Sequence, residues 1–315
     1  MGRHDTTTFC FLGVVVQTGR VAKCGGKRMS GILPESGADH PLFTVVTAVF
    51  NGAETLETTI QSVLCQTYKN VEYIIIDGGS TDRTLDIVRK YEHVIDYWLS
   101  EPDKGVYDAF NKSCPFIMGE WTIFLGAGDV LFDPEVLARV AQVVPETSHE
   151  TELIYGRVSI TNGSDTAVKV LNRPWAQMRG RWRGGRPMLP HSQGVFHRRS
   201  LLEQKHPFDT KYKIAADSKV IYASIARTMP VFCDAIVTRA PLGGLSTEPK
   251  HFLSTAHEIA KINRELGYRN YAHQIWFFLK ILVKSLIYHI GGEAHAKAWI
   301  DRYRLLTGRK PKWTS

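Results

Sequence analysis

The chain has 315 residues, of which 43% are apolar and 22% charged, a composition that fits one large α/β domain with additions or two small domains and excludes a disordered protein. Its five scattered cysteines contain no CxxC pair, which argues against a disulfide framework and favours a reducing, cytosolic environment. The net charge of +8 is compatible with an anionic partner, which could be either a nucleic acid or a membrane surface.

The first forty residues show no clear periodicity and are predicted to be an N-terminal extension. Residues 9–16 resemble the apolar core of a short signal peptide, but no small-residue cleavage site follows them. Met29 is an alternative start of the chain. No stretch approaches the roughly 20 apolar residues that a membrane-spanning helix needs.

Between Pro41 and about Val144, predicted strands alternate with predicted helices. Short β-branched and apolar runs predict strands at residues 43–50, 71–77, 94–100 and 120–125. Helical spacing predicts helices at residues 54–66, 80–91 (with Ser80 or Thr81 as its cap), 106–115 and 133–144 (with Asp133 as its cap). This alternation predicts a mostly parallel, doubly wound sheet flanked by helices.

Polar residues follow three of these strands, at residues 47–51, 77–79 and 126–129. Ligand groups in such sheets gather at the carboxyl ends of the strands, so we expect the three segments to lie close together. The third segment holds a single carboxylate, Asp129, with Gly126 and Gly128 where further acids would complete a metal site. Asp129 is therefore either a weak cation ligand or a simple turn residue.

The second half of the chain begins with two predicted strands between Glu152 and Val170, joined at Asn162-Gly163. A basic loop with five arginines follows at residues 172–187. Residues 208–226 then predict a helix that carries Asp217 near its start, and two or three helices are expected from about Ala256. Residues 250–315 contain twelve Lys and Arg and four acids, and this difference of +8 equals the net charge of the whole chain.

Four segments in this order resemble family 2 inverting glycosyltransferases with the GT-A fold: "TVVTAVFNGAETLETTIQSVLCQTYKNVEYIIIDGGSTDRT", "SEPDKGVYDAFNKS", "GEWTIFLGAGD" and "IAAD". The likeness is greatest to the branch that builds exopolysaccharide and lipopolysaccharide repeat units. It runs from about Leu42 to Ile225. It implies a Rossmann-like GT-A domain at residues 41–245, between the extension at 1–40 and a basic helical region at 246–315.

The resemblance also implies a nucleotide-sugar site, with UDP as the expected nucleotide. Asp77 matches the family acid that hydrogen-bonds the base, although it could instead shape the turn before Gly78, where the family often has a second acid. Lys104 either neutralises phosphate or is merely solvated. The residues that match donor-binding positions of the family are Thr47, Val49, Asn51, Asp77, Gly78, Asp103, Lys104 and Asp129.

Metal and catalytic roles follow from the same likeness. Asp129 matches the remaining acid of the family's Asp-x-Asp motif, and one carboxylate with phosphate oxygens and waters is enough to hold Mg²⁺ or Mn²⁺. The arginines of the 172–187 loop could share that charge. Asp217 matches the base that deprotonates the acceptor hydroxyl, the alternative being an ordinary acid in a first helical turn. His191 and Gln193 are expected to face the acceptor or donor sugar, or to have structural roles.

The implied partners are a nucleotide-sugar donor and a saccharide or lipid-linked acceptor, with no nucleic acid. Residues 274–290 predict either a core-packing helix or an in-plane membrane helix. A cytoplasmic protein at the inner face of the cytoplasmic membrane is therefore expected. A dinucleotide or methyl-donor domain would need G-x-G-x-x-G after the first strand, where only Gly52 is present. A catalytically impaired nucleotide-sugar-binding protein of the same fold remains the alternative.

Overall fold

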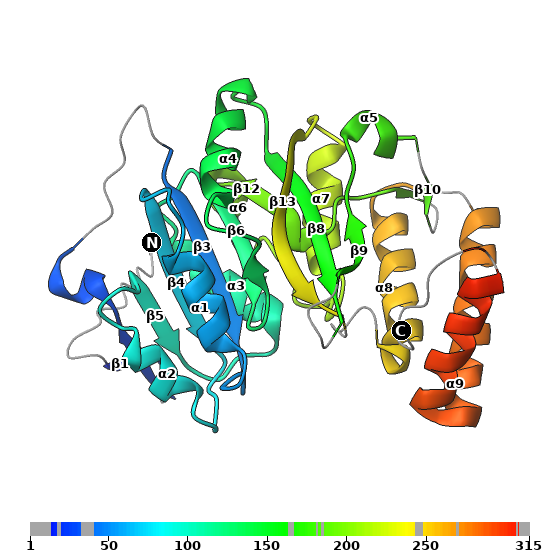
Figure 1. The fold of residues 1–315 in the computed structure, drawn as a ribbon, viewed down its shortest axis with the longest axis horizontal. Helices are drawn as coiled ribbons and strands as arrows, with labels where there is room; N and C mark the ends of the chain where they lie inside the picture. Colours follow the sequence, from blue (N-terminus) through cyan, green and yellow to red (C-terminus); the bar gives the residue numbers. More distant parts are fainter. Residues whose placement is uncertain are drawn as a thin grey trace, which may run out of the picture.

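The computed structural model describes residues 14–17, 20–32, 41–162, 167–180, 182–183, 186–242, 248–268, 271–306 and 308. In this part of the chain eleven strands form one mixed sheet, in the order β1-β2-β5-β4-β3-β6-β12-β8-β13-β7, with β9 paired to β8 (Figure 1). The central strands are parallel: β3 (Phe43–Val49), β4 (Val71–Asp77), β5 (Tyr97–Ser100) and β6 (Trp121–Gly126). The predicted mostly parallel sheet is confirmed.

The second half of the sheet is mixed. β12 (Val195–Arg198) pairs antiparallel with β6 and with β8 (Leu153–Thr161). β13 (Val231–Pro241) runs parallel to β8, and β7 (Val130–Leu131) and β9 (Ala167–Leu171) are antiparallel additions. A small separate ribbon joins β10 (Trp182–Arg183) and β11 (Arg186–Pro187).

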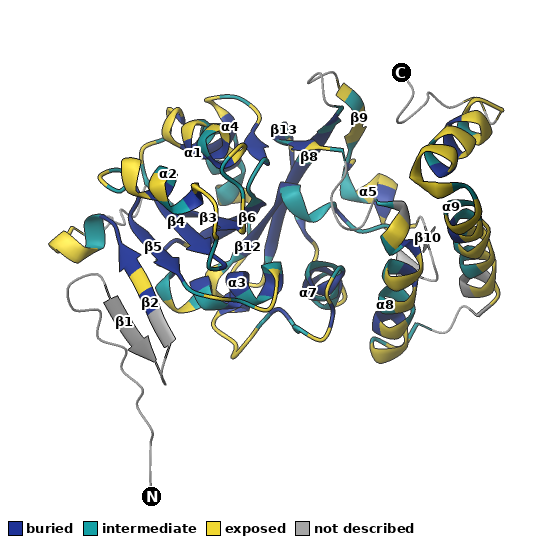
Figure 2. Cartoon of the chain, turned by 90° about the horizontal axis from the view of Figure 1, so that it is seen from below, coloured by how far each residue is buried: buried dark blue, intermediate teal, exposed yellow. Residues whose placement is uncertain are grey.

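Helices cover both faces of the sheet because alternate residues of its buried strands point to opposite sides. Val45 belongs to an apolar cluster with α1 (Leu56–Leu64), α2 (Thr84–Lys90) and α4 (Val136–Val143), whereas Val46 belongs to a cluster with α3 (Val106–Ser113) and α7 (Ala216–Ile225). Figure 2 shows these two groups of helices on opposite faces of the sheet. The shorter helices are η2 (Cys114–Phe116), η3 (Val144–Glu146), α5 (Trp175–Met178), η4 (Ser192–Gly194), α6 (Arg199–Leu202) and η5 (Pro249–His251).

Two predicted helix starts are wrong. Ser80 does not cap α2, because its hydroxyl donates to Asp77 and accepts from the backbone N–H of Asn51. Asp82 performs the equivalent role, since its carboxylate accepts from the backbone N–H of Thr84 at 3.0 Å. The helix expected from Asp133 begins at Val136.

Part of the N-terminal segment belongs to the sheet. This was not predicted, because the first forty residues show no clear periodicity. β1 (Val14–Gln17) pairs with β2 (Arg20–Gly25), and β2 pairs antiparallel with β5. Within η1 (Lys27–Ser30), Arg28 forms an ion pair with the fully buried Glu72 of β4. Cys24 is disulfide-bonded, a pairing that the scattered cysteines did not indicate.

The C-terminal region is helical, as expected. It contains α8 (Phe252–Glu265) and α9 (Tyr271–Leu306). α9 is interrupted at Gly292, whose φ of 74° and ψ of −178° are not helical, so its two arms do not form one straight rod (Figure 1). Over Ile275–Leu306, α9 is long and apolar enough to cross a membrane by length and composition, whereas no such segment was expected from the sequence.

Candidate active site

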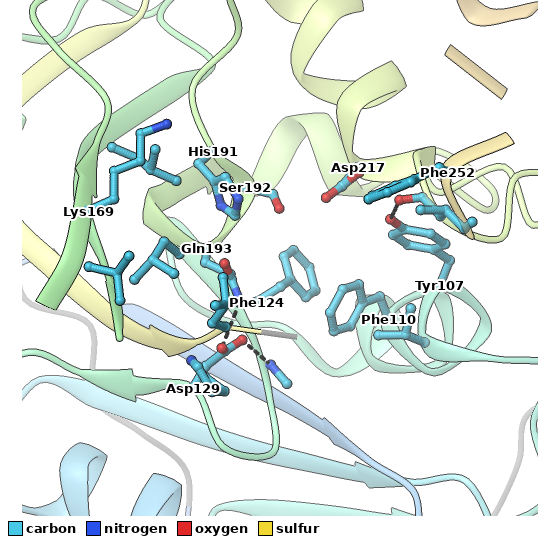
Figure 3. Close-up of a pocket in the computed structure, with 18 of the residues that line it drawn as sticks. Tyr107, Phe110, Phe124, Asp129, Lys169, His191, Ser192, Gln193, Asp217 and Phe252 are labelled. Carbon is cyan, nitrogen blue, oxygen red and sulfur yellow. Dashed lines mark hydrogen bonds between the residues drawn. The ribbon is translucent and has the colours of Figure 1, made fainter. Parts of the chain in front are cut away.

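One cavity of about 600 Å³ brings together Asp129, His191, Gln193 and Asp217, four of the residues singled out in the sequence (Figure 3). They come from the turn after β6, from η4 and its preceding residue, and from the first turn of α7. Phe110 and Phe124 line the cavity between the polar groups. The cavity therefore has separate acidic positions over an aromatic floor.

The turn after β6 places the Asp129 carboxylate in this cavity. Oδ2 accepts from the backbone N–H of Gly126 at 3.0 Å, and Oδ1 accepts from Nε2 of Gln193 at 2.7 Å. Burial raises the pKa of Asp129 to about 6, against these two hydrogen bonds, which lower it. Gly128 adopts a φ of +101°, a conformation that L-residues with a side chain rarely adopt. Its backbone thus explains why no second acid stands there.

The donor atoms around Asp129 fit a cation that needs few protein ligands. Among the described residues, no group of three His, Cys, Asp or Glu side chains could hold a metal. Each Asp129 oxygen accepts one hydrogen bond, and a carboxylate offers about four lone-pair positions, so coordination capacity remains. Mg²⁺ typically takes one or two carboxylates, waters and substrate phosphates, and Asp129 meets that requirement.

Asp217 is positioned by contacts on both sides of the segment that precedes α7. The Tyr107 hydroxyl donates to the backbone carbonyl of Ile214 at 2.8 Å. The Glu258 carboxylate of α8 accepts from the backbone N–H groups of Lys213, Ile214 and Ala215 at 2.7–2.9 Å. Burial, and secondly the Asp217 charge, raise the pKa of Tyr107 well above its ordinary value, so Tyr107 stays a neutral donor beside an acid.

His191 faces the same cavity as a neutral imidazole. Burial lowers its pKa, the Asp217 charge partly opposes this change, and Lys169 adds to it. Its Nδ1 is buried without a hydrogen-bond partner. The backbone N–H of His191 donates to Oδ1 of Asn172 at 2.7 Å, which fixes the segment. The ring thus presents an unused polar atom in the wall of the cavity.

A second cavity of about 380 Å³ lies against the first, and both are lined by Val106. Val49, Gly78 and Asp103 also line it. A Cβ at Gly78 would lie 2.5 Å from Oδ2 of Asp103, so glycine makes room for that carboxylate. Burial raises the pKa of Asp103.

Asp77 lies buried at the end of β4, next to Gly78. Its oxygens accept from the hydroxyls of Ser80 and Ser100, the latter at 2.6 Å. Both oxygens also accept from the backbone N–H of Ser80, at 3.2 Å. The structure thus fixes Asp77 beside the second cavity through two serines.

Three other predicted donor-site residues line neither of these cavities. The Thr47 hydroxyl is buried and shares a 3.1 Å hydrogen bond with Tyr73. Asn51, with a φ of 50°, holds the backbone of Thr81 through its side chain. Lys104 is exposed, and its backbone N–H donates to Asp108.

The cations that the described part of the chain places on the cavity come from outside the predicted arginine loop. Arg173 and Arg179 are exposed and do not line it. Arg181 and the side chains of Arg183 and Arg186 lie outside the described residues. The positively charged side chains on the described wall of the cavity belong to Lys169, Lys284 and Arg304.

The C-terminal helices contribute a wall that the sequence motifs did not indicate. Phe252 of α8 lines the cavity with Lys284, Ile300 and Arg304 of α9, and Phe252 lies close to Asp217 and Tyr107 (Figure 3). No local pattern in these helices marks them as cavity residues, because their contribution depends on tertiary packing alone.

Comparisons with known proteins identify the family and the fold of the chain. A family model described as glycosyl transferase family 2 matches residues 44–204. The "PGL/p-HBAD biosynthesis glycosyltransferase" of Mycobacterium bovis is 33% identical over 184 residues, which cover 56% of this chain and 67% of that protein.

Two solved structures resemble the fold. The mannosyltransferase PcManGT from Pyrobaculum calidifontis, in complex with GDP-Man and Mn²⁺, has a TM-score of 0.55 at 17% identity and covers 90% of this chain and 86% of its own. S. aureus TarS in complex with UDP has a TM-score of 0.52 at 18% identity and covers 82% and 78%. At these identities the likeness concerns the fold.

Proposed function

The chain belongs to the family 2 glycosyltransferases and has their GT-A fold, and from this premise we propose that it transfers a sugar from a UDP-sugar to a saccharide or lipid-linked acceptor with inversion. The observation that carries the proposal is the placement of Asp129 and Asp217, from two different elements, on one cavity. An inverting transferase needs this separation, because in a single in-line displacement the leaving diphosphate and the attacking hydroxyl lie on opposite sides of the anomeric carbon.

The donor nucleotide occupies the second cavity in this proposal. Asp77 and Asp103 accept hydrogen bonds from the base and ribose, and Gly78 keeps the space between them open. Thr47, Val49 and Asn51 flank the nucleotide mainly through their backbone, and Lys104 supports the phosphate charge from the surface. The shared wall at Val106 leads the diphosphate toward Asp129.

Asp129 is the protein ligand of Mg²⁺ or Mn²⁺ in this proposal, and the same carboxylate orients the diphosphate. A bound metal supplies positive charge to the departing diphosphate. Gln193 sets the position of the Asp129 carboxylate by its hydrogen bond. PcManGT, which resembles the fold, was solved with Mn²⁺, and this supports the choice of ion.

Asp217 is the general base. Its carboxylate accepts the proton of the acceptor hydroxyl while that oxygen forms a bond to the anomeric carbon and the bond to the diphosphate oxygen breaks. One displacement inverts the configuration and leaves no covalent intermediate on the protein. His191 and Gln193 orient the sugar, and the neutral His191 ring offers Nδ1 to a sugar hydroxyl.

The proposed domain division assigns residues 41–245 to catalysis, with an N-terminal extension at 1–40 and a basic helical region at 246–315. The relative named for PGL/p-HBAD biosynthesis supports a glycolipid or other cell-surface acceptor. We place the reaction on the cytoplasmic side of the membrane, where nucleotide sugars are made. Nucleic acid is not among the proposed partners.

Thermal shift with UDP, GDP, NAD and S-adenosylmethionine, each with and without Mn²⁺, tests the nucleotide. Stabilisation by UDP, greater with Mn²⁺, is the expected result. Mass-spectrometric screening of nucleotide-sugar hydrolysis then separates an enzyme from an impaired binding protein. Binding of UDP without turnover of any donor in the presence of cell-surface acceptors would favour the binding protein, for which the single acid at Asp129 is the supporting observation.

A further inference from the structure

The burial pattern of the first arm of α9 is inverted relative to a helix in a water-soluble core. Among the described residues of this arm the buried side chain is that of Ser285, at 4% exposure, whereas Ile290 is 79% exposed; the buried residues Ala296, Ile300 and Asp301 belong to the second arm. A continuous apolar face at helical spacing marks a contact surface, and Figure 2 shows exposed residues along both arms. The outward apolar residues of the first arm are Ile275, Trp276, Leu279, Leu282, Val283, Leu286 and Ile290.

The charge of α9 indicates what covers this face. α9 carries five basic residues and two acids, a difference of 5 − 2 = +3. A second copy of the chain would bring like charges together, whereas an anionic bilayer attracts them. Nζ of Lys280 lies 4.9 Å from the centre of the Trp276 ring, and a basic residue beside tryptophan suits the boundary between headgroups and acyl chains.

The orientation of α9 follows from two further features. Lys280 and Lys284 lie near the middle of the first arm, and a spanning orientation would place both ammonium groups deep in the hydrocarbon, which is costly. Gly292 also interrupts the helix. A helix in the plane of the interface avoids both problems, because its apolar face enters the acyl boundary, Lys280 reaches the headgroups and Lys284 stays on the protein side.

The opposite side of α9 belongs to the catalytic cavity. Lys284, Ile300 and Arg304 line it together with Asp217. We propose that α9 is a docking surface for an anionic lipid bilayer, on which it lies flat and holds the cavity of Asp217 at the membrane surface. The inference deepens the proposed function by naming its partner, and it rests on that function for the identity of the cavity as the acceptor site.

Flotation of the full chain with vesicles of equal parts phosphatidylglycerol and phosphatidylcholine tests the proposal. Wild-type protein should float with these vesicles and not with pure phosphatidylcholine. The triple variant Leu282→Ser, Leu286→Ser, Ile290→Ser should bind at least about tenfold more weakly at every salt concentration, since three outward apolar groups are lost. Lys280→Glu should weaken binding about tenfold in low salt and little in high salt.

Matched controls separate docking from folding. Met229→Ser removes an equally exposed apolar side chain outside α9, and Lys205→Glu reverses an exposed charge on another surface; both should float like wild type. UDP binding should be unchanged in every variant, because the proposed nucleotide site does not include α9.

The outcomes distinguish this inference from the proposed function. Wild-type protein that binds UDP but ignores anionic vesicles overturns the docking surface and leaves glycosyl transfer intact. Vesicle binding without UDP binding supports docking and counts against the donor assignment. A dimer in light scattering that the triple variant converts to a monomer would show that a second copy covers the face, and would also overturn the inference.

Discussion

The side chain of Gln193 donates a 2.7 Å hydrogen bond to Oδ1 of Asp129, and so joins η4 to the turn after β6. The other carboxylate oxygen accepts from the backbone N–H of Gly126. Both donors are neutral, and they do not offset the cost of burying the charge, so the pKa of Asp129 is raised to about 6. A metal or a bound nucleotide would therefore meet a carboxyl group that titrates close to neutrality.

The first prediction is that Mn²⁺ tightens UDP binding above about pH 7 and loses this effect on acidification. A metal ligand must be ionised, and at about pH 5, one unit below the raised pKa, the ionised fraction falls about tenfold. Calorimetry of UDP binding with and without Mn²⁺ across this range measures the effect. Asp129→Ala should abolish the Mn²⁺-dependent part at all pH values while leaving the fold intact. Activity that is indifferent to EDTA would contradict the metal assignment.

The same pKa predicts the pH dependence of stability. Because the folded-state pKa of Asp129 is raised, its contribution to the free energy of unfolding is present below the ordinary pKa of about 4 and is lost as pH rises through about 6. Asp129→Asn cannot ionise and should flatten this part of the profile. Urea unfolding of the ligand-free protein between about pH 4 and 7 provides the measurement, and parallel profiles for both proteins would show that the shift is absent.

The second prediction concerns Asp217. Asp217→Asn keeps the size of the side chain but cannot accept the proton, so kcat should fall by about 10²–10⁴. UDP affinity should hardly change, because Asp217 lines the first cavity and not the second. Asp86→Asn is the matched control, since Asp86 is also an acid in the first turn of a helix. Near-normal turnover by Asp217→Asn would remove it from the role.

The third prediction concerns Glu258 as a positioning residue for Asp217. Its carboxylate holds three successive backbone N–H groups before α7, and Glu258→Gln offers a single acceptor oxygen to them. Loss of about 1–3 kcal/mol in stability is expected, together with a fall in kcat of up to about 10²-fold if Asp217 is displaced. Glu203→Gln, on an exposed glutamate, is the control.

UDP affinity separates positioning from general damage in that experiment. Displacement of Asp217 should lower kcat while UDP affinity stays the same, and Glu258→Asp, which keeps the charge, should recover part of the activity. A variant that loses stability and UDP binding together, with kcat per folded molecule unchanged, would show that Glu258 only stabilises the packing of α8 on the rest of the protein and does not position Asp217.

The local sequence pattern predicted the parallel strands at the centre of the sheet, because these strands are buried and their residues are therefore apolar. β3, β4, β5 and β6 are fully or nearly fully buried runs, so their apolar sequences mark them, and the acids that follow them fall at one edge. β2 has no such signal because it is a short strand between the edge strand β1 and β5, and β5 lies far away in the chain. Ser80 looked like a helix cap, but its hydroxyl donates to Asp77 and accepts from the backbone N–H of Asn51, which is a tertiary contact.

Only part of the candidate site could be predicted from the sequence, again because local pattern marks some of its residues and tertiary packing places the others. Asp129 and Asp217 stand in motifs, and the structure places both on one cavity. Lys284, Ile300 and Arg304 stand in a helix whose sequence resembles either a core helix or a membrane helix. Their place on the cavity wall depends on how α9 packs, which no periodicity within the helix encodes.

The fourth prediction restores a second acid beside Asp129. A Cβ at Gly126 meets only Oδ2 of Asp129, at 3.5 Å, so Gly126→Asp is accommodated and places two carboxylates side by side. Without metal, the two charges repel and raise each other's pKa, and stability at neutral pH should fall by about 1–2 kcal/mol. With Mn²⁺, a second oxygen ligand should strengthen metal binding at least about tenfold. Calorimetric titration of Mn²⁺ in the presence of UDP measures it.

Two control variants separate charge from shape in this last experiment. Gly126→Asn has almost the same size without the charge, and should show neither the loss of stability nor the gain in metal affinity. Gly128→Asp introduces the same charge at a residue whose φ is +101°. The strain of a side-chain-bearing residue in this conformation should cost about 1–3 kcal/mol of stability, whatever gain in metal affinity it brings. If Gly126→Asp leaves Mn²⁺ affinity unchanged while Asp129→Ala also has no effect on it, the cation does not bind at the end of β6, and Lys169 becomes the candidate for neutralising the diphosphate.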